Sequence, residues 1–299
     1  MLYCRTLRIA TVAMLAALAA CQSKETGRGA SDSAVAAKPD LTSQPAFAGA
    51  NVVTVTATEY KFDAPAAIPA GLTTIRLVSQ GRELHHVQLI KLEDGKTLED
   101  FVRAAKASGP PPKWAVDAGG PNPPRPGGGV AEITERLEPG NYVIACFVPS
   151  ADGTPHIAKG MLRPLTVTPA TGTSAPEPTA DVVMTLKDYS FELSTPLTPG
   201  RHIIRIDNAG PQSHELVLAR LAPGKTAGDL AAWAEKMVGP PPAEPLGGVS
   251  GIRTGGHAYM VVDLAPGDYG FLCFVPDAKD GKPHVAHGMV KQVKVGGSA

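Results

Sequence analysis

The sequence predicts an all-β protein made of two tandem Greek-key β-sandwiches, each with one short inserted helix. Most apolar segments are short, are rich in Val, Ile, Leu and Thr, and end at Pro-Gly or other glycine-containing turns. One segment in each half of the chain instead repeats its apolar positions at helical spacing. The whole pattern then recurs at an offset of about 127 to 130 residues, as Tyr60 with Tyr189 and Cys146 with Cys273 illustrate. A duplicated domain explains this recurrence.

The expected elements follow the same order in both copies. Strands are expected at residues 52–58, 73–79, 86–92, 142–148 and 165–168, and again at 202–208, 216–221, 269–275 and 290–295. Helices are expected at 98–105 and 230–237, where apolar residues recur at i, i+3, i+4 and i+7. Thr97 with Asp100, and Thr226 with Asp229, supply a capping pattern at the start of each helix.

Length and charge limit the classes of function. The 299 residues fit roughly two domains. Lys and Arg number 28, as do Asp and Glu, so the formal net charge is zero. A nucleic-acid-binding domain would carry a basic excess, so no nucleic-acid partner is expected. Four cysteines are too few for a disulfide-stapled scaffold.

The first 20 residues are typical of an export signal. Arg5 and Arg8 precede an apolar run at 9–20 that is too short to span a bilayer. The run ends in Leu-Ala-Ala-Cys at 18–21, which resembles a bacterial lipobox and implies lipidation of Cys21. We therefore expect an exported, membrane-anchored lipoprotein that faces the periplasm or the cell exterior. An ordinary secretory signal, with Cys21 left as a stray thiol, remains the alternative.

The remainder of the chain divides into four segments. Residues 21–50 lack periodicity and are rich in Ala, Ser, Gly and Lys, which indicates a flexible tether. The first domain is expected at 51–169 and the second at 181–299. Between them, residues 170–180 are rich in Pro, Thr and Ala and are interpreted as a linker.

Each copy contains one cysteine, two histidines and one methionine in the same order. These residues are His85, Cys146, His156 and Met161 in the first copy, and His214, Cys273, His284 and Met289 in the second. Two imidazoles, a thiolate and a thioether form the ligand set of a trigonal copper site with a weak axial methionine. A buried free cysteine is commonly just a small hydrophobe. The recurrence of all four residue types nevertheless favours a metal site in each copy.

Both copies resemble the cupredoxin family, which includes plastocyanin, azurin and the copper domain of nitrite reductase. The motifs that carry the resemblance are Tyr142-x-x-x-Cys146 with Pro155-His156-x-x-x-Gly160-Met161, and their counterparts Tyr269, Cys273, Pro283-His284, Gly288 and Met289. The resemblance implies cupredoxin-like sandwiches with one copper per domain, two per chain, each held by the four residues named for its copy.

This chain also departs from the family. The residue after the first histidine is commonly Asn in cupredoxins, whereas it is His86 or Glu215 here. The loop between the cysteine and the second histidine is longer than in plastocyanin or azurin. We expect His86, and likewise His202, His257 and His287, to be surface groups. A Cys146–Cys273 disulfide is disfavoured, because equivalent strands of separate domains would hold the two Cα atoms too far apart.

The resemblance implies one-electron transfer through a type 1 copper in each domain, with His156 or His284 as the electron port. The expected partner is a redox protein or a membrane-bound electron-transfer complex, reached from the lipid anchor. No enzymatic activity is expected, because multicopper oxidases and nitrite reductases use H-x-H pairs and this sequence has none. Copper storage or delivery remains open. So does a metal-free interaction module, with the Pro/Gly-rich segments 109–129 and 239–256 as binding loops or as lids over the site.

Overall fold

The structure is a computed structural model that describes residues 47–107, 111–170 and 172–296. The expected signal peptide, Cys21 and all but the last four residues of the tether lie outside the described residues. None of the helices within the described ranges is long and apolar enough to cross a membrane. Residues 51–169 are called the first half, and residues 181–299 the second half.

The two halves contain the same elements in nearly the same order. The first half contains β1 (Asn51–Thr58), β2 (Lys61–Asp63), β3 (Ala67–Pro69), β4 (Gly71–Ser79), β5 (Gln88–Leu92), α1 (Leu98–Lys106), β6 (Ala115–Asp117), β7 (Gly129–Leu137), β8 (Gly140–Ala145), the 3-10 turn η1 (His156–Lys159) and β9 (Leu162–Thr168). The second half contains β10 (Val182–Lys187), β11 (Ser190–Leu193), β12 (Gly200–Asn208), β13 (His214–Leu221), α2 (Ala227–Ala234), β14 (Ala243–Ile252), β15 (His257–Leu264), β16 (Gly267–Leu272), the 3-10 turn η2 (His284–His287) and β17 (Val290–Val295).

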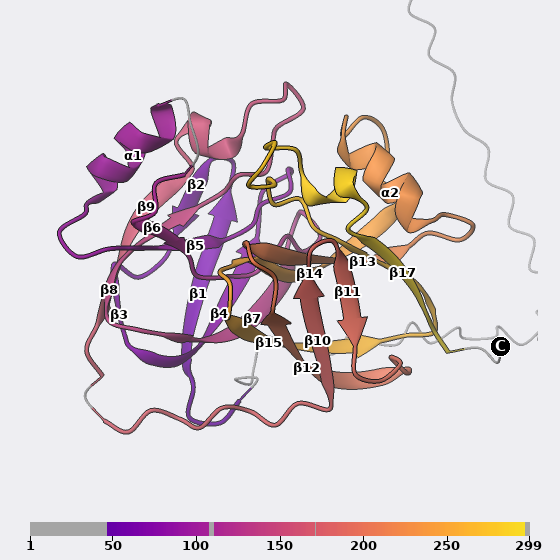
Figure 1. Cartoon of the computed structure of the whole chain (residues 1–299), viewed down its shortest axis with the longest axis horizontal. Helices are drawn as coiled ribbons and strands as arrows, with labels where there is room; N and C mark the ends of the chain where they lie inside the picture. The colour runs from indigo at the N-terminus through magenta and orange to yellow at the C-terminus, as the bar shows by residue number, and fades with distance from the viewer. Residues whose placement is uncertain (1–46, 108–110, 171, 297–299) are drawn as a thin grey trace, which may run out of the picture. The chain divides into compact units, whose positions relative to one another are not determined.

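The described strands form three sheets, and one of them crosses both halves. The five-stranded sheet, β3-β9-β8-β5-β6, belongs to the first half, and the four-stranded sheet, β14-β13-β16-β17, belongs to the second. The eight-stranded sheet runs β11-β10-β12-β15-β7-β4-β1-β2 and joins the halves where β15 pairs with β7 (Figure 1). The all-β prediction is confirmed. Two self-contained sandwiches are not confirmed, because this sheet is continuous across the chain.

A core lies between the eight-stranded sheet and each smaller sheet. In the first half, β1 alternates buried and exposed residues, so that Val53 and Val55 point to the core. They pack in one buried cluster with Ile144 from β8. The corresponding cluster in the second half includes Met184 and Phe271. Each core also contains the cysteine and the final methionine of its half, so the candidate ligands lie in the best-packed part of the fold.

Each helix covers the face of its smaller sheet that points away from the core. In α1, Phe101 packs against residues of β5 and β8, and in α2, Leu230 packs against residues of β13 and β16. Both predicted capping patterns are present as reciprocal capping boxes. The second helix begins and ends three residues earlier than expected, and Met237, with a left-handed backbone at φ 49°, lies beyond its end.

The Pro/Gly-rich segments, expected as binding loops or lids, instead meet each other between the halves. Residues 118–124 run antiparallel to residues 246–252, with bridges at Ala118–Ile252, Pro121–Val249 and Pro124–Leu246. Glycine is required here, because a Cβ at Gly248 would lie 1.9 Å from the Leu216 carbonyl oxygen and φ is +118°. These segments therefore form an interface between the halves.

The expected linker is held against both halves over its described part. The Ser174 hydroxyl accepts hydrogen bonds from the Leu72 N–H at 3.2 Å and from the Arg136 guanidinium at 2.7 Å. The Glu177 carboxylate accepts from the Tyr259 hydroxyl of β15 at 2.9 Å and pairs with Arg136 of β7 at 3.6 Å. Residues 172–180 thus tie the two halves together.

Candidate metal centres

The cysteine, second histidine and methionine of each half are positioned by one backbone-bonded loop. Cys146 follows β8, and its N–H donates to the Met161 carbonyl at 3.1 Å, while the Ile157 N–H donates to the Cys146 carbonyl at 2.7 Å. The Met161 N–H donates to the His156 carbonyl at 3.0 Å. Gly160 ends η1 with φ 94°, a left-handed conformation that favours glycine. The second half repeats this loop around Cys273, His284, Gly288 and Met289.

In both halves the two histidine Nδ1 atoms and the cysteine sulfur converge. His85 Nδ1 lies 3.1 Å from His156 Nδ1, and Cys146 Sγ lies 3.4 Å from His156 Nδ1. In the second half, the two Nδ1 atoms are 3.0 Å apart, and Cys273 Sγ lies 4.0 Å from His214 Nδ1 and 3.3 Å from His284 Nδ1. The donor atoms of each trio all lie within 4.8 Å of one another. The structure therefore brings together three of the four predicted ligands in each half.

The donor triangles fit a small metal cation. Bonds of about 2.0 Å to nitrogen and about 2.3 Å to sulfur, spread around one plane, would separate the donors by roughly 3.5 to 3.7 Å. The observed separations of 3.0 to 4.0 Å bracket these values. Met161 and Met289 are fully buried in the same core clusters as the cysteines. Each site therefore combines two imidazoles, a thiol and a neighbouring thioether out of contact with water.

Burial sets the protonation states of the donors. It raises the pKa of the Cys146 thiol to about 12 and raises the pKa of the Cys273 thiol as well. It also lowers the pKa of His85 and of His284 to about 4, helped in each case by the neighbouring imidazole. Without metal, the two cysteines are therefore protonated thiols, and His85 and His284 are neutral imidazoles. A bound cation would displace the thiol proton, because thiolate is the form that ligates.

A carboxylate holds one imidazole in each half, but not the equivalent one. Glu83 Oε2 lies 2.7 Å from Nε2 of His156, the second histidine of the first half. Asp188 Oδ1 lies 2.7 Å from Nε2 of His214, the first histidine of the second half. The other imidazole of each pair, His85 or His284, has a buried Nε2 without a hydrogen-bond partner among the described residues. Carboxylates of this kind orient a ligating imidazole and raise its basicity.

The sequence did not predict these carboxylates, nor two further pairs of residues at the sites. The rings of Tyr60 and Tyr189 meet His156 and His284 edge-on, with centroids 5.2 and 5.4 Å apart. Gly81 and Gly210 leave room for the ring of the first histidine in their half, since a Cβ there would lie 2.6 or 2.5 Å from its Nε2. The tyrosines and the glycines both recur at the repeat offset, and this recurrence could have identified them from the sequence. Glu83 and Asp188 occupy non-equivalent positions, so the duplication hides them.

Two expectations about histidine exposure are wrong. His156 and His284, expected as outer edges that exchange electrons, are fully buried, and the rings of Tyr60 and Tyr189 pack edge-on against them. His86 and His202, expected at the surface, are also buried. Burial lowers the pKa of His86 to about 4, so it is neutral. His257 and His287 are partly exposed, as expected of surface groups.

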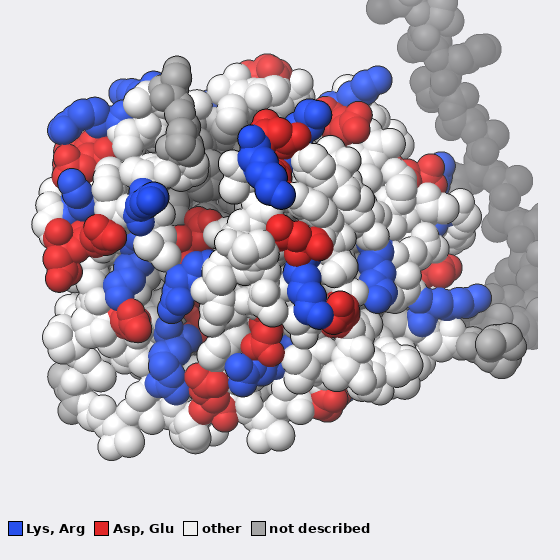
Figure 2. Space-filling view, in the orientation of Figure 1, with Lys and Arg blue, Asp and Glu red and all other residues white. Residues whose placement is uncertain are grey.

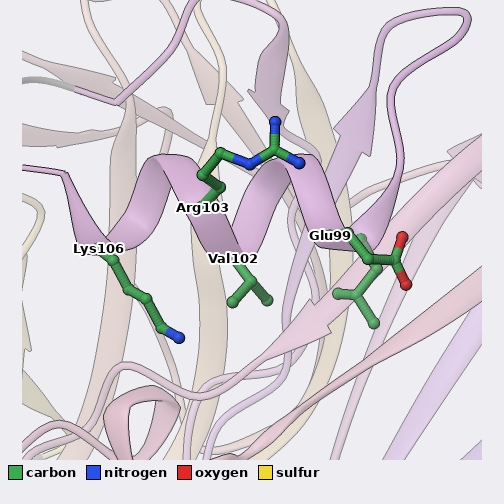
Figure 3. Close-up of a pocket in the computed structure, with 5 residues that line it drawn as sticks. Glu99, Val102, Arg103 and Lys106 are labelled. Atoms are coloured by element: carbon green, nitrogen blue, oxygen red, sulfur yellow. The ribbon is translucent and has the colours of Figure 1, made fainter.

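Two other features of the described residues lie apart from the donor triangles. Asp277, Asp280 and His287 are close enough to share a cation, but Asp277 already accepts from the Tyr189 hydroxyl at 2.6 Å, and Asp280 already bonds His287 at 3.1 Å. A hollow of about 330 Å³ lies beside α1 (Figure 3). It is lined by Leu98, Val102 and charged side chains of that helix, and it contains none of the candidate ligands.

No protein-family model and no curated protein matches this chain. Similar solved structures include dithionite-reduced auracyanin from the photosynthetic bacterium Roseiflexus castenholzii, with 21% identity over 40% of this chain and 99% of that chain, at a TM-score of 0.28. A multicopper oxidase is 14% identical over 82% of this chain and 88% of its own, at a TM-score of 0.24. A copper-containing nitrite reductase from Thermus scotoductus is 10% identical over 82% of this chain and 61% of its own, at 0.22.

These comparisons correct one expectation. The sequence predicted a protein without enzymatic activity, because it contains no H-x-H pair. The similar structures that cover 82% to 83% of this chain include multicopper oxidases, a blue copper oxidase and the nitrite reductase. The expectation that the chain is not an enzyme is therefore withdrawn.

Proposed function

We propose that the chain is an exported copper protein with a redox function and one type 1 site in each of two cupredoxin-like domains, residues 51–169 and 181–299. The proposed ligands are His85, Cys146, His156 and Met161 in the first, and His214, Cys273, His284 and Met289 in the second. The observation that carries this proposal is the pair of buried donor triangles, each with two imidazole nitrogens and one sulfur. Lipidation of Cys21 would tether the protein to a membrane.

The donor chemistry favours copper over other cations. Thiolate and thioether sulfur are soft ligands that select copper, whereas magnesium and calcium prefer oxygen. Zinc accepts the same nitrogen and sulfur donors, but the buried methionine of each half would add the weak thioether ligand that is typical of blue-copper sites. Bound copper would supply one-electron chemistry by alternating between its +1 and +2 states.

The protein's own contribution is to hold the donors still and keep water away. The backbone bonds around Cys146 and His156 fix the loop that carries three of the four ligands. Gly81 lets the His85 ring pack tightly, and Glu83 orients the His156 ring. Because the donors have no exposure, rapid exchange of the metal is disfavoured, which supports a resident redox ion over storage or delivery. Electrons would leave past Tyr60 or Tyr189 to a redox protein or a small substrate.

The test is copper titration of the purified chain and of three variants. One, two and three equivalents of Cu(II) are added while visible absorption and bound copper are recorded. We expect an intense thiolate-to-copper band that saturates at two equivalents. Cys146→Ser and Cys273→Ser should each saturate at one, and the double variant should show no band. A band that persists in the double variant would show that the ligands lie elsewhere, and binding without the band would favour storage.

The reduced protein then distinguishes the two redox roles. Its reoxidation is followed with a small soluble cytochrome, with dioxygen and with nitrite. Rapid reoxidation by the cytochrome alone would assign electron transfer. Turnover with dioxygen or nitrite would assign enzymatic activity.

A further inference from the structure

A chain of buried hydrogen bonds runs between the two candidate metal sites. It begins at the Phe147 N–H, which donates to His86 Nε2 at 2.9 Å. His86 Nδ1 then lies 3.3 Å from Asn122 Oδ1, and Asn122 Nδ2 donates to Glu215 Oε2 at 3.1 Å. The other oxygen of Glu215 accepts from the Phe274 N–H at 2.7 Å. We call His86, Asn122 and Glu215 the inter-site bridge.

The bridge ends next to the proposed sulfur ligand in both halves. Phe147 directly follows Cys146, and Phe274 directly follows Cys273. His86 and Glu215 directly follow the first histidines, His85 and His214. Each end of the bridge is therefore covalently attached to the first histidine of its site and hydrogen-bonded to the residue that follows the cysteine. Only Asn122 lies outside both ligand loops, in the segment that forms the interface between the halves.

The directions of these hydrogen bonds are fixed by elimination. A backbone N–H can only donate, so His86 Nε2 must accept and the ring proton must sit on Nδ1. Asn122 Oδ1 then accepts that proton, which leaves its NH₂ group facing Glu215. Glu215 can accept at both oxygens, so no member of the chain opposes its neighbour. The two N–H groups of Asn122 are shared among Glu215 and the carbonyl oxygens of Leu216 and Val249. Reversing the Asn122 amide would place two donors face to face at His86 and two acceptors face to face at Glu215.

Asn122 also makes hydrogen bonds to the backbone at the interface between the halves. Its Nδ2 also lies 3.0 Å from the carbonyl oxygens of Leu216 and Val249, so the NH₂ end cannot turn toward His86 without losing both. The side chain is 1% exposed. A nearby residue at the same interface, Ser250, satisfies only backbone carbonyls, at Val87, Gly119 and Gly120. Ser250 therefore provides a matched interface contact that does not connect the sites.

We propose that the inter-site bridge couples the two metal sites, with Asn122 as the positioning residue that links them. Metal bound at one site fixes the loop that contains its cysteine and therefore the N–H that follows it. That N–H orders its bridge partner, Asn122 transmits the orientation, and the N–H beside the second cysteine is ordered in turn. Filling the first site thus lowers the ordering cost at the second, which is positive cooperativity. This inference rests on the proposed metal binding.

The experiment uses zinc, a redox-inert probe that takes nitrogen and sulfur ligands. Stepwise Zn(II) affinities are measured by chelator competition for the full chain, and single-site affinities for Cys146→Ser and Cys273→Ser. The coupling factor is the product of the two stepwise constants divided by the product of the two single-site constants. We expect at least fivefold, the lower end of typical coupling between sites. Asn122→Asp, which replaces the bridging NH₂ with oxygen, should reduce it to within twofold of unity, and Ser250→Ala should leave it unchanged.

A second readout keeps the proposal testable if Asn122→Asp is poorly folded. In Cys273→Ser, zinc can enter only the first site. Filling that site should still shift the amide resonance of Phe274 in the other half, and Glu215→Gln should abolish the shift by opposing two NH₂ groups. A coupling factor near one in the wild-type chain would overturn the inference while leaving metal binding intact. Coupling that survives Asn122→Asp, or that Ser250→Ala removes equally, would also overturn it. Absence of zinc and copper binding would overturn both proposals.

Discussion

The two halves share a ligand set, but they surround it differently. In the first half the carboxylate of Glu83 holds the second histidine, and in the second half Asp188 holds the first histidine. The residue after the first histidine is a neutral His86 in one half and an acidic Glu215 in the other. Because groups next to the ligands tune metal affinity and potential, the two sites are not copies of one another. The duplication preserved the donors and changed their partners.

The surfaces do not explain this difference. Lys and Arg are interspersed with Asp and Glu over the face seen in Figure 2. A further difference lies in the interior, where the halves meet. Glu135 of β7 is buried there, and Val262 occupies the corresponding place in β15. Changing one residue at a time in each half therefore tests which of these differences matters to metal binding and stability.

The largest expected effect comes from the glycines behind the first histidines. In Gly81→Ala the new methyl group would lie 2.6 Å from His85 Nε2, so the ring must turn and its Nδ1 must leave the donor triangle. Gly210→Ala does the same to His214. Each should lower zinc affinity by about 10- to 100-fold in its own half only, measured by chelator competition in Cys273→Ser or Cys146→Ser. Gly172→Ala is the control, because no described atom lies within 4 Å of its Cβ. An equal loss in both halves would contradict the prediction.

The next largest effect is expected from removing the carboxylates that orient one imidazole in each half, Glu83 and Asp188. Glu83→Ala should weaken zinc binding about tenfold in the first half, and Asp188→Ala should do so in the second, because each removes the acceptor that orients one imidazole. The histidine that changes should differ: His156 in one variant and His214 in the other, observed through their ring-proton resonances. Asp152→Ala, which removes an exposed partner of Lys159, should change neither site. If the equivalent histidine responded in both halves, the different placement of Glu83 and Asp188 would have no consequence for the sites.

The duplicated pattern predicted the strand-rich class well, because it depends on local order. It placed the cysteine, histidine and methionine of each half in one loop, and the structure gives the same loop twice. It could not predict the eight-stranded sheet, whose joint is the pairing of Tyr259 with Thr134, residues 125 positions apart without a local signal. Nor could it predict that Asn122 lies between the halves. Such contacts depend on how two folded surfaces meet, which periodicity does not encode.

A smaller effect tests Glu135, a buried acid whose counterpart in the second half is Val262. Burial raises the pKa of Glu135 well above its ordinary value of 4.5, against a hydrogen bond from Gly120 that lowers it. The folded state then holds a proton that the unfolded state has lost, so stability falls as pH rises above about 4.5. Glu135→Gln should remove this slope and add on the order of 1 kcal/mol at pH 8, with little change near pH 4. Urea unfolding at both pH values measures it.

Glu138, at the end of the same strand, is the control for that prediction. The hydrogen bond and the charge of Lys91 lower the pKa of Glu138. The ionised carboxylate therefore stabilises the folded state above its unfolded-state pKa, and this stabilisation is lost as pH falls. Because the pair is exposed, Glu138→Gln should change stability only slightly and with the opposite dependence on pH. Parallel slopes for the two variants would exclude burial as the cause of the Glu135 effect.

The smallest effect concerns the helices, where the halves are most alike. Thr97 Oγ1 accepts from the Asp100 N–H at 3.2 Å, and Thr226 Oγ1 accepts from the Asp229 N–H at 3.0 Å. Thr97→Ala and Thr226→Ala should each cost about 0.5 to 1 kcal/mol of unfolding free energy, and the Thr→Ser variants should retain the cap. Zinc affinity should not change, because each helix packs on the face of its sheet opposite the core that holds the cysteine. A changed affinity in Thr97→Ala alone would mean that α1 reaches its site through β8, and the halves would then differ in their helices as well as in their carboxylates.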